Sequence, residues 1–393
     1  MAALAAAGHE IVDAASAPDR IIVRGCSVTA KAAREGRRAV SALRKANPQA
    51  AVFAAGCLDA AGVPRAGTLE APRGTGFAPQ TARGYLEIQD GCSGKCAYCI
   101  VPRFRGAPRS APWRALEAEA RAFLAAGCTE IVVTGCNAAL YRDPESGLDL
   151  AGLLERLARM ESPGHRIRLG SLEPGVCDAA VVDAMARNPN VCRFLHLSVQ
   201  SASARVLGLM RRAYGPDALE RAAAAARKAM PGIALGADVI AGFPGETDAD
   251  FRETADFVAR FRISNLHVFP YSERPGTEAA SMSGAVPPEV RRRRARELAA
   301  AGERIRREFA ASFVSAPVEV CIERPAEEGR PAGGWTSEYL RCTVDCPAPR
   351  RALVRAVAVS ASDGALHAVV RQDRPGLDRP QRRVAANAAL PPP

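Results

Sequence analysis

Short apolar segments alternate with helical segments over residues 82–313, and this alternation constrains the fold more than any other feature of the chain. The predicted strands of this region are Tyr85–Gln89, Glu130–Thr134, Arg166–Leu169, Phe194–Val199, Ile233–Ile240 and Asn265–Phe269. The helices predicted between them include Trp113–Ala126, Leu150–Met160 and Ala249–Phe261, the last capped by Thr247 and Asp248. Strand–helix repetition implies an α/β fold with a parallel sheet, open or curled into a barrel, and ligands at the carboxyl ends of the strands.

Regions of different character flank this core. Residues 1–70 are also predicted to be α/β, with strands at 21–23 and 51–55 on either side of a basic helix. Residues 71–81 carry the prolines and glycines typical of a linker. Residues 314–371 predict a small all-β domain, with strand-like segments at 318–322, 339–344, 352–359 and 366–370. Residues 372–393 are rich in proline, arginine and alanine, and we expect them to be disordered.

The net charge of +11 favours a polyanionic partner, but codon bias explains it equally well. Lysine occurs only at positions 31, 45, 95 and 228, so arginine supplies almost all of the 53 cationic side chains, as in the product of a GC-rich genome. No apolar run is long enough to span a membrane, and the first nine residues lack the basic start and cleavage site of a signal peptide. We therefore expect a cytoplasmic protein without membrane contact.

Three cysteines in one short loop are the strongest chemical signal. Cys92, Cys96 and Cys99 follow a predicted strand with the spacing C-x3-C-x2-C. Three such thiolates can each hold one iron of a cubane cluster and leave the fourth iron open for a cofactor. A structural zinc ion would need a fourth protein ligand, and the next stretch has no cysteine or histidine. We interpret the loop as a 4Fe-4S site, with Tyr98 packed beside the cluster or a bound adenine.

This loop resembles the motif of the radical S-adenosylmethionine (SAM) enzymes, and its flanks narrow the resemblance to the methylthiotransferases. The flanking segments are Leu86–Cys92, Ile100–Gly106 and Arg109–Ser110. The stretch from His267 to Thr277 is similar to that of the subgroup acting on threonylcarbamoyladenosine in tRNA, the MtaB type. The resemblance implies a partial (β/α) radical SAM barrel. Its cluster, held by the three loop cysteines, accepts an electron from an external donor and cleaves SAM to a 5′-deoxyadenosyl radical.

Further motifs carry the cofactor-binding residues that the resemblance implies. They stand at strand ends and at one strand-to-helix turn, within Val133–Asn137, Ser171–Pro174, His196–Ser201 and Asp238–Thr247. Residue by residue, the resemblance indicates cofactor contacts for Tyr98, Thr134, Gly135, Ser171, Glu173, Gln200, Gly242 and Gly245. The glycines of the last motif let backbone approach a ligand, and the helix start offers free N–H groups. His196 and His267 face the same site, but we interpret them as structural.

The resemblance also implies a second 4Fe-4S cluster, which takes part in sulfur insertion and is held by three cysteines of an N-terminal domain. Cys26 and Cys57 match two of these ligands. The family's opening strand and first cysteine are missing, and residues 1–12 resemble the helix after them, so we expect an incomplete domain. Two thiolates hold a cubane cluster poorly. Cys136 is a minor alternative as a substitute ligand, because a packed cysteine is commoner.

The C-terminal β domain resembles TRAM, a small RNA-binding barrel. Trp335 and Tyr339 either stack on bases or pack in the core, and the sequence leaves these alternatives equal. The arginines at 291–294 lie in a charged helix predicted over 287–313. They either contact tRNA phosphates or form a solvated helix face.

The resemblance therefore predicts a tRNA methylthiotransferase that uses one SAM as a radical source and another as a methyl donor. Its expected substrate is N6-threonylcarbamoyladenosine at position 37, next to the anticodon, which receives a methylthio group at C2. The alternatives are a methylthiotransferase acting on isopentenyladenosine in tRNA or on a ribosomal-protein aspartate, and a non-catalytic iron–sulfur RNA-binding protein.

Overall fold

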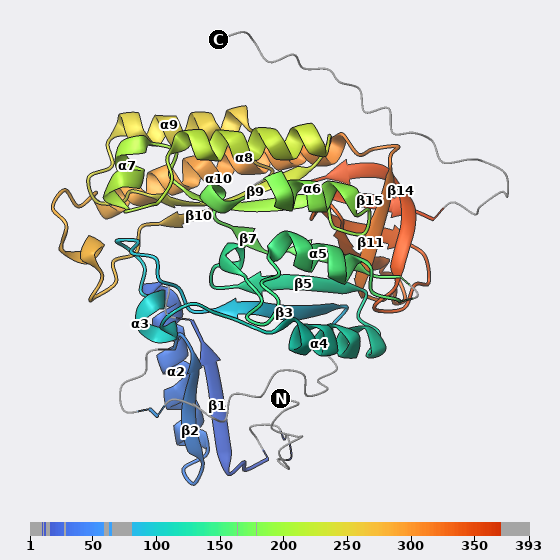
Figure 1. The fold of residues 1–393 in the computed structure, drawn as a ribbon, viewed down its shortest axis with the longest axis horizontal. Helices are drawn as coiled ribbons and strands as arrows, with labels where there is room; N and C mark the ends of the chain where they lie inside the picture. Colours follow the sequence, from blue (N-terminus) through green and yellow to red (C-terminus); the bar gives the residue numbers. More distant parts are fainter. Residues whose placement is uncertain are drawn as a thin grey trace.

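The computed structural model describes residues 16–26, 29–58, 81–162, 164–177 and 179–370, together with positions 10, 12, 63 and 64. The predicted helix over 1–12, the linker over 71–81 and the tail over 372–393 lie outside the described residues, apart from positions 10, 12 and 81. The described chain forms an N-terminal α/β unit, a central α/β core and a C-terminal barrel (Figure 1). No described helix is both long enough and apolar enough to cross a membrane.

Two four-stranded sheets build the core. The first has the order β4-β3-β5-β6, with β3 (Arg83–Asp90), β4 (Arg109–Ser110), β5 (Glu130–Gly135) and β6 (Arg166–Leu169). The second has the order β7-β8-β9-β10, with β7 (Ser171–Leu172), β8 (Phe194–Gln200), β9 (Ala234–Ala241) and β10 (Asn265–Pro270). Every pair is parallel except β3 with β4, which confirms the predicted parallel strands and adds the two-residue strands β4 and β7.

The chain leaves the first sheet and enters the second at Gly170, between β6 and β7. The Gly170 N–H donates to the Val133 carbonyl oxygen at 2.8 Å. A Cβ atom on Gly170 would lie 2.9 Å from that same oxygen, so a larger residue would force the two segments apart. The close passage at this glycine therefore keeps the second sheet next to the first.

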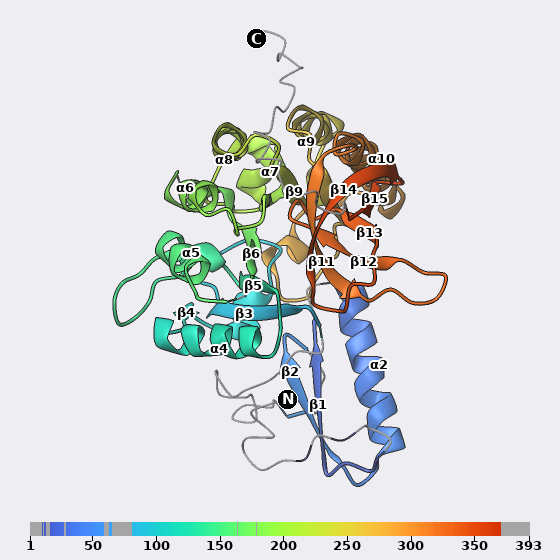
Figure 2. The same cartoon turned by 90° about the vertical axis from the view of Figure 1, so that its right-hand side faces the viewer.

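Most of the helices cover the outer faces of the two sheets (Figure 2). In chain order they are α4 (Trp113–Ala125), α5 (Leu150–Ala158), α6 (Ala179–Arg187), α7 (Ala204–Leu209), α8 (Pro216–Ala229), α9 (Asp248–Arg260) and α10 (Pro288–Ala311), whereas the short α3 (Val101–Arg105) buries no residue. Their apolar faces and the strands form one continuous hydrophobic core, the main favourable term in folding. Thr247 caps α9 in a capping box with Asp250, which confirms the predicted start of that helix.

The N-terminal unit is a two-stranded parallel sheet with one helix. β1 (Arg20–Gly25) pairs with β2 (Ala51–Gly56), and α2 (Ala30–Ala46) connects them. The Thr29 side chain accepts the Ala32 N–H at 3.1 Å, so the basic helix, which the sequence predicts over 28–46, begins at Ala30. In Figure 1 this unit lies at one end of the molecule, next to α3.

The C-terminal domain is a closed barrel with the strand order β11-β12-β13-β15-β14. Its strands are β11 (Pro317–Arg324), β12 (Ala332–Thr336), β13 (Arg341–Asp345), β14 (Leu353–Ser362) and β15 (Ala365–Val369). The four predicted strands are confirmed, and β12 is an addition because Gly333 and Gly334 weaken its strand propensity. Gly334 is required there, since a Cβ atom would lie 1.9 Å from the Cys321 carbonyl oxygen of β11.

A buried ion cluster joins the barrel to the core. Glu130 accepts from Arg166 Nε at 2.7 Å and from Arg168 Nε at 2.8 Å, and all three side chains are almost fully buried. The remaining guanidinium N–H groups donate to backbone carbonyls of the barrel, those of Glu319, Trp335, Thr336 and Ser337. The cluster therefore fixes the barrel on the core through backbone geometry, while one carboxylate compensates the two cations.

Acid should weaken this junction. Burial alone would raise the pKa of Glu130, but the charges and hydrogen bonds of Arg168 and Arg166 outweigh it and lower the pKa from 4.5 to about 2. A carboxyl whose pKa is depressed by folding contributes stability above its unfolded pKa and loses it as the pH falls through the folded value. We expect the stability difference between wild type and Glu130→Gln to shrink between pH 4.5 and pH 2, measured by urea unfolding. A constant difference would contradict this assignment.

Candidate functional site

The cysteine loop begins at Gly91, directly after β3, and backbone contacts fix both ends. Gly91 has a φ of +77°, and a Cβ atom there would lie 2.1 Å from the Ala107 carbonyl oxygen, so glycine is required. The Cys92 N–H donates to the Gly106 carbonyl at 3.0 Å. The Ala97 N–H donates to the Met210 carbonyl at 3.0 Å, at the end of α7. The loop is therefore held between the first sheet and a helix of the second half of the core.

The three thiols of this loop do not form a set close enough to bind one ion together in this structure. Gly94 lies between two of them: a Cβ atom on it would be 3.2 Å from Cys92 Sγ and 3.7 Å from Cys96 Sγ. Zn–S bonds of about 2.3 Å bring thiolates within about 4 Å of each other. Among the described residues, the three sulfur atoms are not a group that lies within 4.8 Å of one another. Burial raises the pKa of Cys99 to about 11, so iron binding must displace its proton.

Arg212 connects the loop to the second sheet, and sequence reasoning missed it. Its Nη1 donates to Cys96 Sγ at 3.1 Å and to the Tyr98 hydroxyl at 3.3 Å, while its Nη2 lies 3.0 Å from Glu173 Oε1. Asn137 Nδ2 donates to the other Glu173 oxygen at 2.9 Å. Two predicted residues, Tyr98 and Glu173, thus meet around one partly buried cation beside the thiols. No spacing pattern marks Arg212, because it lies in a loop more than a hundred residues from Cys96.

A pocket of about 240 Å³ opens beside the loop, where the carboxyl ends of β8, β9 and β10 converge. It is lined by Thr29, Tyr98, Cys99, Ile100, Val101, Gln200, Asp238, Ile240, Phe269, Pro270, Tyr271 and Ser272. Three predicted residues, Tyr98, Cys99 and Gln200, therefore share one cavity. Gln200 has a φ of +63° where the pairing of β8 with β9 shifts register, a strained conformation of the kind that gathers at functional sites. The cavity can hold a ligand beside a thiol in mostly apolar surroundings.

Asp238 gives this pocket a fixed negative charge. Its Oδ1 lies 3.0 Å from His196 Nε2 and 3.1 Å from His267 Nδ1. Burial alone would raise the pKa of Asp238, but the hydrogen bonds of both imidazoles outweigh it and hold the pKa well below its usual range. Gly236 makes room for this arrangement, since a Cβ atom there would lie 2.4 Å from His196 Nδ1. The two histidines orient a carboxylate that sequence reasoning did not assign. His196 is buried but His267 is half-exposed, and the ligand atoms of the three side chains lie within 4.8 Å of one another, close enough to hold a metal ion. The interpretation of both histidines as structural stays a prediction.

The turn at 242–246 uses its N–H groups internally. The Gly242 N–H donates to Glu246 Oε1 at 2.9 Å, and the Gly245 N–H donates to the Gly284 carbonyl at 2.7 Å. The N–H groups of both glycines are therefore paired within the protein, and the Asp250 N–H in the first turn of α9 donates to Thr247 Oγ1 at 3.3 Å. That the glycine backbone approaches a ligand stays a prediction. The φ values of the two glycines, +76° and +81°, explain why glycine stands there.

Two of the four arginines at 291–294 hold the same turn. Arg294 is buried, and it donates to Glu246 Oε1 at 2.7 Å and to Asp248 Oδ1 at 2.7 Å. Arg291 packs against the turn, since a Cβ atom on Gly242 would lie 2.5 Å from Arg291 Cγ, while its Nε donates to the Val286 carbonyl at 2.7 Å. Neither alternative predicted for the whole run is right, since half of it is internal and only the pair 292–293 is exposed.

Six of the predicted cofactor contacts are not among the residues that line the pocket. Glu173, Gly242 and Gly245 are described above, and the other three are Thr134, Gly135 and Ser171. Thr134 and Gly135 end β5, and a Cβ atom on Gly135 would lie 2.7 Å from the Gln89 carbonyl oxygen. Ser171 is exposed on β7, opposite His196 of β8. Gly135 thus has a packing role, and none of the three is brought to the cysteine loop by a described pocket.

The two N-terminal cysteines stand at the adjacent ends of β1 and β2. The Cys57 N–H donates to the Gly25 carbonyl at 3.1 Å, so parallel pairing brings Cys26 and Cys57 to one edge. Arg105 Nε donates to Cys57 Sγ at 3.5 Å. These two thiols fit two ligands of a second cluster.

Cys136 lies near the same edge but is otherwise engaged. Its Sγ donates to Asp90 Oδ1 at 3.3 Å, and Arg105 lies 3.3 Å from the other oxygen of that carboxylate. Burial and the hydrogen bond to Asp90 raise the pKa of Cys136 to about 12. Cys136 is exposed, so the expectation of a packed cysteine is wrong, and its role as a substitute ligand stays a prediction.

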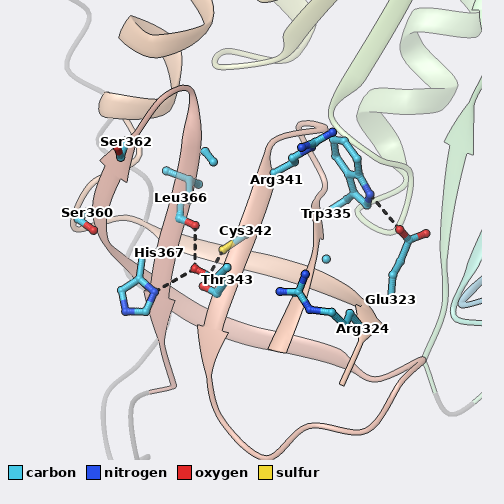
Figure 3. Close-up of a pocket in the computed structure, with 13 residues that line it drawn as sticks. Glu323, Arg324, Trp335, Arg341, Cys342, Thr343, Ser360, Ser362, Leu366 and His367 are labelled. Carbon is cyan, nitrogen blue, oxygen red and sulfur yellow. Dashed lines mark hydrogen bonds between the residues drawn. The ribbon is translucent and has the colours of Figure 1, made fainter. Parts of the chain in front are cut away.

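The barrel carries a second hollow, of about 460 Å³, on its outer face. Figure 3 shows Arg324, Arg341 and His367 around it, with the Trp335 indole donating to Glu323 at 3.1 Å. Tyr339 is stacked between Trp335 at 4.7 Å and Phe194 of the core at 4.9 Å. Of the two alternatives for Tyr339, packing is therefore confirmed, because both faces of its ring are covered.

Comparison with known proteins gives two family matches and several relatives. Residues 86–258 match the Radical SAM superfamily, and residues 1–65 match Uncharacterized protein family UPF0004. Threonylcarbamoyladenosine tRNA methylthiotransferase MtaB of Bacillus subtilis is 35% identical over 66% of this chain and 58% of its own length. The tRNA-2-methylthio-N(6)-dimethylallyladenosine synthase of Chlorobium limicola is 38% identical over 62% of this chain and 55% of its own. The chain thus spans little more than half the length of these relatives.

Two further matches differ in extent. A synthase of the same name from Erythrobacter litoralis is 35% identical over 80% of this chain and 72% of its own length. Among solved structures, coproporphyrinogen III oxidase of Escherichia coli, a radical SAM enzyme, aligns with 61% of this chain and 56% of its own. That alignment has a TM-score of 0.43 and 18% sequence identity.

Proposed function

Because the chain belongs to the radical SAM methylthiotransferase family, we propose that it attaches a methylthio group to C2 of N6-threonylcarbamoyladenosine at position 37 of tRNA. The observation that carries this proposal is the loop of three thiols, whose Cys99 and Tyr98 wall a ligand-sized pocket together with Gln200 and Asp238. Relatives with tRNA-modifying names support tRNA as the substrate class. The proposed setting is the cytoplasm, with an external electron donor.

The residues of the loop have defined tasks in this proposal. Cys92, Cys96 and Cys99 would hold a 4Fe-4S cluster, which with SAM supplies the radical chemistry. Arg212 donates N–H groups to the sulfur side of the loop and compensates the negative charge that bound thiolates bring. The Tyr98 ring packs edge-on against Phe243 at 6.3 Å and closes one wall of the pocket. Apolar walls exclude water from the place where a radical would form.

The other two units have supporting tasks. Cys26 and Cys57 would hold two irons of the second, sulfur-donating cluster. Arg324 and Arg341 on the barrel and the exposed arginines at 292–293 would contact tRNA phosphates, in keeping with a TRAM-like barrel. The buried cluster of Glu130, Arg166 and Arg168 keeps that RNA-binding face at a fixed distance from the cysteine loop.

Nucleoside mass spectrometry tests this function. We expect tRNA from a strain lacking the gene to lose 2-methylthio-N6-threonylcarbamoyladenosine, and a copy of the wild-type gene to restore it. A copy encoding Cys99→Ser should fail, whereas Cys346→Ser, in the barrel, should restore the nucleoside. Loss of the methylthiolated isopentenyl nucleoside instead would assign the second candidate, which the name of the Erythrobacter litoralis relative favours. An unchanged nucleoside pool would reject both.

A further inference from the structure

One buried arginine of the core has no counter-charge. Four arginines of the described chain are buried, and three of them, at 166, 168 and 294, bind glutamates. The fourth is Arg274, which is only 7% exposed. Its Nε has no hydrogen-bond partner, and no described residue forms an ion pair or a hydrogen bond with its guanidinium group. The side chain is therefore a mostly buried cation with no counter-charge among the described residues, and its terminal nitrogens keep some accessible surface.

Such a group is costly, so its presence calls for an explanation. Burying an unpaired charge without hydrogen bonds costs several kcal/mol. Arg294 shows the ordinary solution nearby: its Nε is also unpartnered, but its other nitrogens bind Glu246 and Asp248. The Tyr271 hydroxyl, three residues before Arg274, is likewise buried without a partner. Two unsatisfied donors in one turn indicate that an acceptor is supplied from outside the chain.

The turn that carries these donors adjoins the proposed reaction site. Tyr271 and Ser272 line the pocket that also contains Cys99. A few residues further along, the Ala279 N–H donates to the Ala97 carbonyl at 2.8 Å, inside the cysteine loop. Arg274 thus lies in a segment that walls the pocket on one side and is fastened to the cysteine loop on the other. Arg274 itself is not among the residues that line the pocket, so a ligand that reaches it must extend past Tyr271 and Ser272.

We propose that Arg274, assisted by the Tyr271 hydroxyl, binds a carboxylate of the ligand seated in this pocket. A guanidinium group pairs with a carboxylate through two parallel hydrogen bonds, and it is the only cation of the segment that is buried. Under the proposed function, on which this inference rests, two carboxylates reach the site. One belongs to the threonyl group of the nucleoside, and the other belongs to the methionyl group of SAM.

The test compares Arg274→Gln with a matched control, Arg211→Gln. Arg211 is another arginine beside the cysteine loop, but it is half-exposed and paired with Glu278 at 2.7 Å. Both are made in the reconstituted full-length protein. Without ligand, Arg274→Gln should melt at the same or a higher temperature than wild type, because it removes an uncompensated buried charge. A structural arginine would show the opposite, a lower melting temperature.

Ligand measurements then identify the carboxylate. Loss of the buried charge pair should lower the affinity for the ligand that supplies the carboxylate at least about 30-fold. If the nucleoside supplies it, KM rises for a stem-loop carrying threonylcarbamoyladenosine, while the Kd of SAM stays unchanged. If SAM supplies it, the Kd of SAM rises, whereas 5′-methylthioadenosine, which lacks the carboxylate, binds wild type and variant equally. Arg211→Gln should change neither constant.

Three outcomes would overturn the proposal. They are unchanged constants for both ligands, a fall in melting temperature, or equal loss of affinity for an unmodified stem-loop, which would make Arg274 a phosphate contact. A wild-type protein that methylthiolates no stem-loop would reject the proposed function instead. In that case, equilibrium dialysis of SAM and of free threonylcarbamoyladenosine with wild type and with Arg274→Gln still shows whether Arg274 binds a carboxylate.

Discussion

Replacing Cys99 by serine is expected to remove the loop cluster and to reduce SAM cleavage to background. A cubane cluster in this loop has three protein ligands, so the variant leaves two thiolates, and two hold a cluster poorly. Cys99 also walls the pocket, so the loss falls where the ligand sits. The measurement is iron content and the visible charge-transfer absorbance of the reconstituted protein, followed by 5′-deoxyadenosine release under dithionite.

The control for this variant is Cys346→Ser, a half-buried cysteine of the barrel. It should keep the iron, the absorbance and the cleavage of wild type. Cys26 and Cys57 would bind irons of a different cluster from that of the loop. Cys99→Ser should therefore retain any iron bound at the N-terminal unit. A Cys99→Ser protein that cleaves SAM at the wild-type rate would refute the assignment of this thiol as a cluster ligand.

Replacing Glu130 by alanine is expected to cost about 3–5 kcal/mol of unfolding free energy, as when one partner of a buried pair is removed. The variant leaves Arg166 and Arg168 buried with no carboxylate between them. Their remaining hydrogen bonds run to barrel carbonyls, so the loss falls on the junction between the core and the barrel. Urea unfolding should show a lower midpoint, and the barrel should separate from the core at an earlier step.

A surface pair gives the matched control. Glu117 binds Arg121 at 2.7 Å one helical turn away on α4, and Glu117→Ala should cost no more than about 1 kcal/mol. If the junction positions the RNA-binding face, Glu130→Ala should also lower methylthiolation of tRNA while uncoupled SAM cleavage continues. Equal stability losses for Glu117→Ala and Glu130→Ala would contradict the role of the buried cluster.

Local sequence patterns predicted the strands and the cysteine loop because both depend on neighbouring residues. Most apolar runs are buried whichever sheet they join, and C-x3-C-x2-C places three thiols within one loop. Strand β12 escaped prediction because Gly333 and Gly334 have low strand propensity. Its strand state depends on β11, whose Cys321 carbonyl approaches Gly334 too closely for any side chain.

The sequence by itself determined the order of the elements, the three-thiol loop and the family. Only the tertiary structure decided which charges are compensated, because ion pairing joins residues far apart in the chain. It paired Arg212 with Cys96, gave the histidines at 196 and 267 a shared Asp238, and turned Arg294 inward onto Glu246. It also left Arg274 buried and unpaired, which no sequence pattern reveals, since a lone arginine in a turn is ordinarily solvated.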